Sequence, residues 1–375
     1  MREDFYTFQL ERQMSVWEYQ VTYNLSESGV HPMSVAELAK DDPNFLDELL
    51  STGLNYPQTN GLIELRDNIA ALYPGSNRDN VVVTTGAAQA NFTSLLTLLD
   101  PVDELLVMLP NYMQIWGVGK NYKLNVNSFS LDQELDWGFD IDAFKKQVSE
   151  KTRLIAVCNP NNPTGHIMST DEMEAVIDAA DRVGAWILAD EVYAGAEHNQ
   201  DKVTPSFWGK YDRVLAVGSL SKAYALPGLR IGWVVAPSET AEAIWARQDY
   251  ITICTTMLSN KIAAYALTPA VRARLLARTR AHVREGYSNF ERWCEAHDEL
   301  ISLTPPQAAA IAFVRYYRDI NSGELVDRLI HEQDTYVVPG DHFGLDHYLR
   351  ISYGLSDDFV NEGLNRIAET LLSVD

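Results

Sequence analysis

Six short apolar runs constrain the fold of this chain more than any other feature. Most of them alternate with helical patterns, which is typical of βαβ units and of a mostly parallel sheet whose strands are buried on both faces. The last run follows its predecessor too closely for a crossover helix, so we expect these two strands to be antiparallel. The runs are VVVTT (81–85), LLVML (105–109), RLIAVC (153–158), AWILAD (185–190), RVLAVGS (213–219) and RIGWVVA (230–236).

Helix candidates lie between these runs, at 87–99 and 169–184. The second has Ser169 or Thr170 as N-cap, acidic residues in its first turn and Gly184 as its stop. From about residue 270 a long charged helical stretch leads into a segment with a mixed helix and strand pattern. Since chains beyond about 250 to 300 residues usually divide, we predict a large domain at 46–275 and a smaller α+β domain at 276–375.

Charge and cysteine content exclude several classes of function. The net charge of −22 is scattered along the chain, so we expect neither nucleic acid nor an anionic membrane as partner. Cys158, Cys254 and Cys294 are odd in number and form no CxxC, which argues against a disulfide framework or a zinc site and favours a reducing cytoplasm. No apolar run is long enough to span a bilayer.

One lysine stands out in SLSKAYALPGLRIGW (219–233). Lys222 is flanked by small residues and follows a strand that delivers it to the carboxyl edge of the sheet, where α/β folds place their sites. A desolvated lysine loses part of its preference for the charged form, and its free amine then forms a Schiff base with a carbonyl. The alternative is a solvated surface lysine.

A phosphate-bearing ligand would explain the neighbours of Lys222. The guanidinium of Arg230 and the hydroxyls of Ser219 and Ser221 are suited to phosphate. In VVVTTGAAQANF a helix begins directly after a strand, so the free backbone N–H groups of Ala87 and Ala88 are candidates for the same role. The alternatives are an arginine that pairs with a surface carboxylate and a turn that only joins strand to helix.

Two further polar positions end buried strands. Asp190 closes AWILAD and needs a positive partner, for which a protonated pyridine nitrogen is suitable, and Tyr193 follows in reach of the same ring. The turn CNPNNPTG (158–165) is stiffened by proline and presents the amide of Asn162. A helix-capping Asp, a core Tyr and a turn without chemistry are the alternatives.

Together, NPNNPTG, DEVY, SLSKAYALPGLRIGW and YLRISYG, in this order, resemble the class I and II aminotransferases. These are pyridoxal 5′-phosphate (PLP) enzymes of fold type I. The resemblance extends from about Tyr56 to Arg350 and implies an α/β fold with a mostly parallel seven-stranded sheet sandwiched by helices, plus a smaller α+β domain. It also implies PLP as cofactor, a free L-α-amino acid as substrate and a homodimer with active sites at the interface.

The resemblance implies a role for each matching position around the cofactor. Lys222 would form the Schiff base and carry the proton. Asp190 would keep the pyridine nitrogen protonated, and Asn162 and Tyr193 would bind the ring oxygen. The remaining positions would hold the phosphate or the ring: Ser219, Ser221, Arg230, Ala87 and Ala88 at the phosphate, Tyr112 stacked on the ring, and Tyr56 reaching the neighbouring subunit's phosphate.

In the family, the residues that bind the substrate differ from those that bind the cofactor. Arg350 matches the arginine that binds the substrate α-carboxylate, where a bidentate fork fixes the Cα–H bond relative to the ring. The resemblance further implies that residues 1–45 cover the active site and join the small domain. The family's dicarboxylate-specific members bring a second arginine from the partner subunit. The corresponding region here, 249–261, contains no arginine, so the resemblance speaks against a dicarboxylate as the dedicated substrate.

We therefore expect an aminotransferase that converts a free amino acid to its 2-oxo acid. The alternative comes from the N-terminal segment, which loosely resembles that of PLP oxidases and cyclases acting on arginine-derived guanidino amino acids, of the capreomycidine or enduracididine type. In those enzymes acids of this segment meet the guanidinium, so Glu18 and Glu27 are candidates here. Solvated surface charge is the other explanation of these acids, and the fold does not decide among the reactions.

Overall fold

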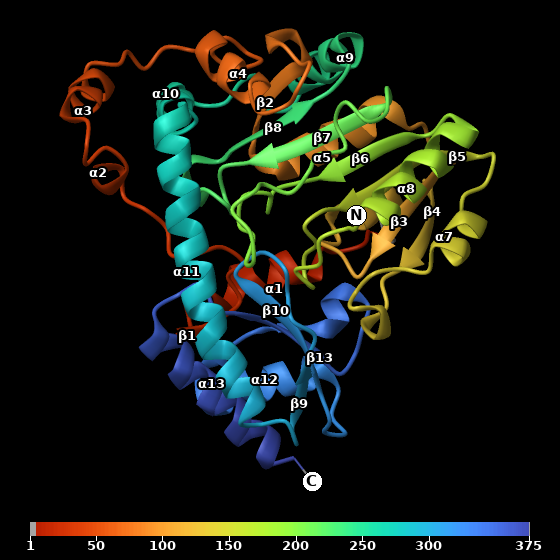
Figure 1. The fold of residues 1–375 in the computed structure, drawn as a ribbon, viewed down its shortest axis with the longest axis vertical. Helices are drawn as coiled ribbons and strands as arrows, with labels where there is room; N and C mark the ends of the chain where they lie inside the picture. The colour runs from red at the N-terminus through yellow and green to blue at the C-terminus, as the bar shows by residue number, and fades with distance from the viewer. Residues whose placement is uncertain (1–4, 375) are drawn as a thin grey trace.

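A computed structural model describes residues 5–374 of the 375-residue chain. Its centre is a seven-stranded sheet with the order β2-β8-β7-β6-β5-β3-β4 (Figure 1). The strands are β2 (Val81–Thr85), β3 (Glu104–Leu109), β4 (Asn125–Ser130), β5 (Thr152–Cys158), β6 (Trp186–Asp190), β7 (Val214–Ser219) and β8 (Ile231–Val235). All neighbours are parallel except β8, which is antiparallel to β7, as predicted, and also to β2.

Helices bury both faces of this sheet. Alternate strand residues contribute to two separate cores, Val82 and Leu215 to one and Val83 and Ala216 to the other, as the two-residue period of a strand requires. The first core is completed by α5 (Gly86–Leu98), α6 (Gln114–Asn121) and α9 (Ser238–Gln248). The second is completed by α4 (Ile63–Ala70), α7 (Ile141–Gln147), α8 (Thr170–Val183) and α10 (Met257–Ala266).

Helix α8 shows how closely local signals set the element ends. The Ser169 hydroxyl accepts from the Glu172 backbone N–H at 3.2 Å, and the Glu172 carboxylate accepts from the Ser169 N–H at 2.7 Å. The helix stops at Gly184, which has the left-handed φ of 68° that glycine adopts without strain. Of the two N-caps considered from sequence, Ser169 is the one used.

A second, smaller sheet lies toward the C-terminus, in the order β12-β13-β10-β9. Its strands are β9 (Ile301–Leu303), β10 (Ile311–Tyr316), β12 (Val338–Pro339) and β13 (Tyr348–Ser352), packed with α12 (Ser322–Gln333) and α13 (Asp357–Leu372). The N-terminal strand β1 (Tyr23–Asn24) pairs in parallel with β11 (Thr335–Tyr336). The preceding helix α1 (Gln9–Trp17) lies between the two sheets (Figure 1), and α2 (Val35–Leu38) and α3 (Pro43–Leu50) follow.

One long helix joins the two parts. Helix α11 (Pro269–Glu295) has 27 residues, so it is about 40 Å long. Leu275 and Leu276 near its start belong to a core of the large sheet, whereas Phe290 and Trp293 near its end belong to the core of the small one. The boundary predicted between 275 and 276 falls inside this helix, and the division into 1–45, 46–275 and 276–375 remains a prediction.

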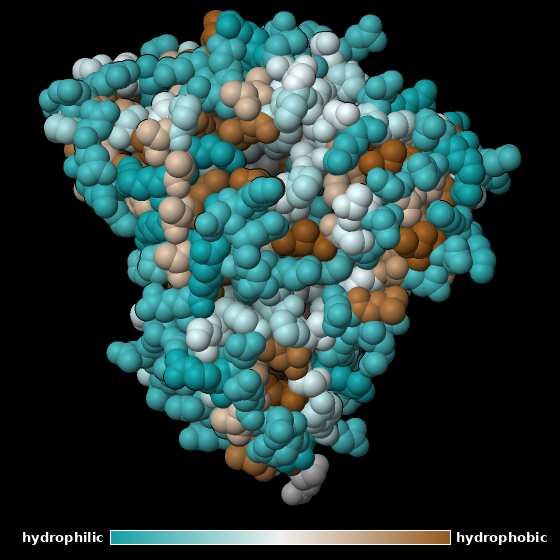
Figure 2. Space-filling model, viewed as in Figure 1, coloured by the Kyte–Doolittle hydropathy of each residue, from teal (hydrophilic) through white to brown (hydrophobic). Residues whose placement is uncertain are grey.

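Hydrophilic residues cover most of the face seen in Figure 2, and the hydrophobic residues form small separate patches. Among residues 5–374, no helix combines the length and apolar character needed to cross a bilayer. The three cysteines are free thiols.

Candidate active site

A cavity of about 530 Å³ opens between the carboxyl ends of the large-sheet strands, the small sheet and α1, within the size range of ligand sites. The loops and strand ends around it bring together every predicted site residue except Tyr56. These are Glu18, Glu27, Ala87, Ala88, Tyr112, Asn162, Asp190, Tyr193, Ser219, Ser221, Lys222, Arg230 and Arg350.

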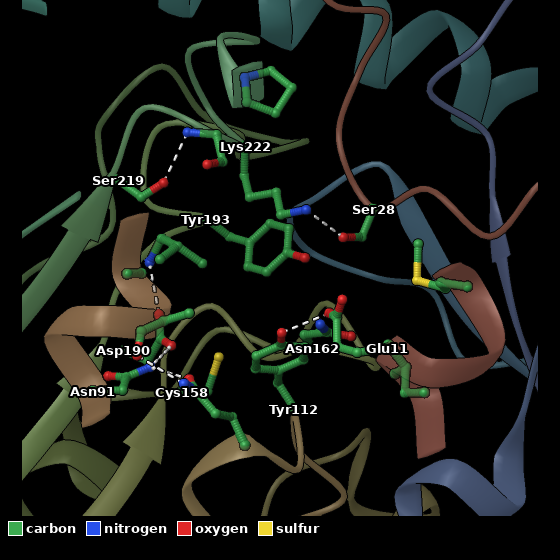
Figure 3. A pocket seen from close by; sticks show the side chains of 18 of the residues that line it. Glu11, Ser28, Asn91, Tyr112, Cys158, Asn162, Asp190, Tyr193, Ser219 and Lys222 are labelled. Atoms are coloured by element: carbon green, nitrogen blue, oxygen red, sulfur yellow. Dashed lines mark hydrogen bonds between the residues drawn. The ribbon is translucent and has the colours of Figure 1, made fainter. Parts of the chain in front are cut away.

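Lys222 stands in the loop after β7, and its side chain is partly buried. Its Nζ donates to the Ser28 hydroxyl at 2.7 Å (Figure 3). Burial lowers the pKa of Lys222, and the positive charges of Arg350 and Arg230 lower it further, against the opposing charges of Glu27 and Glu11. Because the pKa is lowered, a larger share of Lys222 is present as the free amine, the form that attacks a carbonyl.

Asp190 is the last residue of β6 and is only 7% exposed. Its carboxylate accepts from Asn91 Nδ2 at 2.9 Å and from the Val192 backbone N–H at 3.3 Å, both neutral donors. Burial raises the pKa of Asp190, while these two bonds and the charge of Lys222 oppose the rise. A buried carboxylate that faces a cavity with neutral partners is suited to a protonated ligand nitrogen.

An anion site lies at the start of α5. The N-cap residue Thr85 provides no side-chain cap, so the first N–H groups of the helix face the cavity end of the strand uncapped. A Cβ at Gly86 would come within 2.3 Å of Arg230 Nη2, so the absence of a side chain allows the guanidinium to lie against the helix start. Arg230 Nη1 donates to Ser221 Oγ at 3.4 Å and to the Pro227 carbonyl at 3.2 Å. Cation, hydroxyl and free N–H groups together fit a phosphate.

Arg350, on β13, is 1% exposed although it carries a charge. Nη1 donates to Asn162 Oδ1 at 3.2 Å and Nη2 to the Ser26 carbonyl at 2.5 Å, both neutral oxygens, and the buried Nε has no partner among the described residues. Burial lowers the pKa of Arg350. A buried cation without a paired carboxylate is costly, so this position favours a ligand that brings one.

Two tyrosines border the cavity. The Tyr193 hydroxyl is buried and makes no hydrogen bond of acceptable geometry within residues 5–374, although the nearby Ser28 hydroxyl and Arg350 partly offset the rise that burial causes in its pKa. The Tyr112 hydroxyl donates to Glu11 Oε1 at 2.6 Å (Figure 3). The unpartnered Tyr193 oxygen is available to a polar group on a ligand ring.

The N-terminal segment contributes acids to the same cavity. Glu18 and Glu27, the two acids proposed from sequence, line it, and Glu11, which sequence reasoning missed, joins them. Burial raises the pKa of Glu18, and the negative charges of Glu27 and Glu11 raise it further. Glu11 and Glu18 are seven residues apart, the spacing of one helix face, and this was the signal that could have identified Glu11.

Sequence reasoning also missed Asn91 and Ser28, which contact Asp190 and Lys222. Asn91 lies on α5, where an amide in an apolar helix gave no separate signal. Tyr56 is 81% exposed and does not line the cavity of its own chain. Its predicted role requires a second subunit and remains a prediction.

A family model described as aminotransferase class I and II matches residues 23–367. The chain belongs to this family. Capreomycidine synthase of Streptomyces vinaceus is 30% identical over 94% of this chain and 90% of its own length. A PLP-dependent aminotransferase of Streptococcus suis superposes with a TM-score of 0.92 at 29% identity over 100% and 99% of the two chains. The PLP-dependent cyclase OrfR does so with a TM-score of 0.89 at 26% identity over 99% and 98%.

The fold is therefore the fold type I architecture of PLP enzymes, with PLP as its cofactor. The residues of this chain fit that molecule. The uncapped start of α5 with Arg230 suits its phosphate, the buried Asp190 its pyridine nitrogen and the unpartnered Tyr193 hydroxyl its ring oxygen. When bound, PLP supplies an electron sink that stabilises negative charge on the substrate α-carbon.

Proposed function

We propose that this PLP-dependent enzyme acts on a free L-α-amino acid with a positively charged side chain. The observation that carries the proposal is the set of carboxylates of Glu11, Glu18 and Glu27, which line the same cavity as Lys222 and Arg350. Burial raises the pKa of Glu18, and the like charges of Glu27 and Glu11 raise it further, so these three carboxylates repel one another. A cationic side chain would relieve this repulsion, whereas an acidic one would add to it.

The substrate's α-carboxylate is assigned to Arg350. Its guanidinium is buried with an unpartnered Nε, so a bidentate carboxylate would satisfy the group and orient the substrate Cα. Asn162 accepts from Arg350 and holds the fork in place. This arrangement exposes the Cα–H bond to Lys222, whose Nζ takes up and holds the Cα proton.

The remaining assignments concern the cofactor. Asp190, oriented by Asn91, is proposed to hold the pyridine nitrogen, and Tyr193 and Asn162 the ring oxygen. Ser219, Ser221 and Arg230, with the N–H groups of Ala87 and Ala88, are proposed to hold the phosphate, and Tyr112 the ring face. The region of Asp190, Ser219, Lys222 and Arg230 is called the cofactor end of the cavity below, and that of Glu11, Glu18 and Glu27 the side-chain end.

Transamination to the 2-oxo acid is the reaction we propose first, since a proton held by Lys222 and a fixed Cα–H bond are what it requires of the protein. The second candidate is cyclisation of a hydroxylated guanidino amino acid with loss of water, or oxidation of a guanidino amino acid with dioxygen as the electron acceptor. It is supported by the acids of the side-chain end together with the similarity to capreomycidine synthase and to the cyclase OrfR. The two candidates differ in one requirement, because only transamination consumes a 2-oxo acid acceptor.

The test is a panel of amino acids offered with and without pyruvate or 2-oxoglutarate. We expect arginine, ornithine or lysine, or their hydroxylated derivatives, to be consumed faster than norleucine and far faster than aspartate. Consumption that depends on the acceptor supports transamination, and consumption without any acceptor supports the second candidate. A preference for aspartate or norleucine would refute the substrate class.

We also propose a cytoplasmic homodimer. The free thiols are compatible with a reducing compartment. Tyr56 is exposed beside Leu54, which is 82% exposed, and large apolar side chains left in water often mark an interface. Tyr56 is proposed to reach the partner's phosphate site. Sedimentation should give twice the chain mass of 42.1 kDa, and Tyr56→Phe should weaken PLP binding without dissociating the dimer.

A further inference from the structure

Residues 25–33, called the strap below, form an extended segment that connects the small sheet to the lysine loop. Its backbone is fastened at both ends, so its side chains have fixed positions. The bonds are Leu25 N to Tyr336 O at 2.8 Å, Ser352 N to Leu25 O at 2.9 Å, His31 N to Gly354 O at 3.0 Å and Met33 N to Ala225 O at 3.1 Å.

Ser28 lies in the middle of the strap and is 6% exposed. Its hydroxyl accepts from Lys222 Nζ at 2.7 Å, as the dashed line in Figure 3 marks. The next residue, Gly29, lies so near that a Cβ there would contact the Ser221 carbonyl at 3.6 Å and Lys222 Cδ at 3.9 Å. The strap is therefore packed directly against the aliphatic stem of the lysine as well as its amine.

The same strap contacts the other end of the proposed substrate site. The Ser26 carbonyl accepts from Arg350 Nη2, two residues before Ser28 binds Lys222. The Ser26 hydroxyl points elsewhere and donates to Asn24 Oδ1 at 2.6 Å. The strap thus contacts both Arg350 and Lys222, the two groups that would engage one substrate α-carbon.

We propose that Ser28 is a positioning residue that holds the Lys222 amine at the cofactor end of the cavity and favours its protonated state. The proposal rests on the assignment of Lys222 as the cofactor lysine. A serine oxygen accepts a charge-assisted bond from a protonated nitrogen, which is about twice as strong as the neutral bond that the hydroxyl can donate to a free amine. Ser28 therefore stabilises the protonated nitrogen more than the neutral one.

The charges around Lys222 favour its protonated and its neutral form in opposite ways, so the Ser28 hydrogen bond can influence which form is present. Glu27 and Glu11 on the N-terminal segment favour the protonated amine, and Asp190 on β6 adds its negative charge. Arg350 on β13 and Arg230 after β7 favour the neutral amine, as does burial. Since these influences oppose one another, one hydrogen bond to a charged donor shifts the balance measurably.

The experiment measures protonation at Lys222 directly, without relying on turnover. In the PLP-loaded enzyme, the visible absorbance is titrated against pH, and in the cofactor-free full chain the rate of Lys222 acetylation is followed by peptide mass spectrometry over the same range. Ser28→Ala is expected to move both midpoints downward by about one pH unit, the size expected for loss of a charge-assisted hydrogen bond.

Matched variants distinguish the effect of the Ser28 hydroxyl on Lys222 from a general effect on packing of the strap. Ser28→Thr keeps the hydroxyl and should retain the wild-type midpoints, whereas Ser28→Cys keeps the volume with a weaker acceptor and should give a smaller downward shift. Ser26→Ala removes a buried hydroxyl from the same strap that does not reach the lysine, so its midpoints should match the wild type. Ser28→Cys also serves if Ser28→Ala does not fold.

Unchanged midpoints in Ser28→Ala and Ser28→Cys would overturn the proposal, and so would an equal shift in Ser26→Ala. A failure of the underlying assignment has a different signature. If Lys222→Ala kept an absorbance band that borohydride bleaches, Lys222 would not be the cofactor lysine, whatever the Ser28 variants show.

Discussion

The cofactor end and the side-chain end of the cavity are supported in different ways. Asp190 and Ser219 are the last residues of adjacent parallel strands, and the start of α5 follows β2 directly, so the sheet sets their spacing. Glu11 and Glu27, by contrast, project from a helix and a strap at the cavity rim, and both are exposed. The contrast suggests that the chemistry shared by the family rests on the rigid sheet, whereas selectivity rests on a separate segment that can vary independently.

The side-chain end is nevertheless tied to both parts of the molecule. Glu11 accepts from Tyr112 of the large part, and Tyr6 exchanges two bonds with Asn121, at 2.9 and 3.0 Å. On the other side, β1 pairs with β11 of the small part. The acids of the side-chain end are therefore held over the cavity. Variants at the cofactor end should affect cofactor binding and chemistry, whereas variants at the side-chain end should affect the choice of substrate.

The largest effect is expected at the cofactor end with Lys222→Ala. Lys222 is the proposed Schiff-base amine and proton carrier, and losing both roles should reduce turnover of every amino acid by at least about a thousandfold. The lysine-dependent absorbance, bleachable by borohydride, should disappear at the same time. Lys210→Ala, an exposed lysine outside the cavity, is the control and should resemble the wild type. If Lys222→Ala retained turnover, the assignment of the chemistry to the cofactor end of the cavity would be wrong.

Arg350→Gln is expected to have the next largest effect. The variant loses the buried fork proposed to bind the α-carboxylate, so kcat/KM should fall by about a hundredfold, and by the same factor for cationic and uncharged amino acids. Absorbance of the bound cofactor should remain. Arg315→Gln, on the neighbouring strand but exposed, is the control. A fall in kcat/KM confined to cationic substrates would mean that Arg350 affects recognition of the substrate's side chain rather than of its α-carboxylate.

Glu11→Gln and Glu27→Gln should have a smaller and selective effect. Each removes one charge that would bind the substrate's cation, so KM for arginine-like substrates should rise by about tenfold while KM for norleucine stays the same. Steady-state kinetics on both substrates checks this, with Glu174→Gln, exposed on α8, as the matched control. If both substrates respond equally, the acids serve structure rather than selectivity.

The smallest expected effect is a pH dependence that belongs to Glu18. Its raised pKa means that, on acidification, it takes up a proton at a higher pH than an ordinary glutamate. The attraction for a cationic side chain is then full above that pKa and lost as the pH falls through it, so KM for arginine-like substrates should rise severalfold in mild acid. Glu18→Gln should abolish the difference between arginine and norleucine profiles. A difference that persists in this variant would assign it to another group.

The difference between the two ends of the cavity also explains which features could be predicted from the sequence. The strands at 81–85 and 214–219 lie within the predicted runs because strands buried on both faces are continuously apolar. Strand β4 was missed because it is the edge strand of the sheet and its residues, NVNSFS, are mostly polar. The cofactor-end residues stood out because each lies at the end of a strand or in the turn beside it, and these turns have an unusual composition.

The side-chain end was only partly predictable. Glu18 and Glu27 were proposed through resemblance. Glu11 was not, because its seven-residue spacing from Glu18 becomes informative only once Glu18 is known to line the cavity, and an acid on an amphipathic helix otherwise has the same pattern whether it faces solvent or a ligand. Ser28 was missed because its partner, Lys222, is 194 residues away in sequence. Contacts of this range are set by packing of whole elements, and a local pattern does not contain them.

The pairing of β1 with β11 has a consequence for biosynthesis. The Thr22 backbone N–H donates to Asp334 Oδ1, 312 positions later in the chain, so the N-terminal segment finds its binding surface only after residues 334–336 have been synthesised. Until then α1 and the strap lack their small-sheet partners, while β2 to β8 are already complete and able to pair. The nascent chain should thus order its cofactor-binding half before the segment proposed to select the substrate, and closure of the cavity becomes a late step of folding.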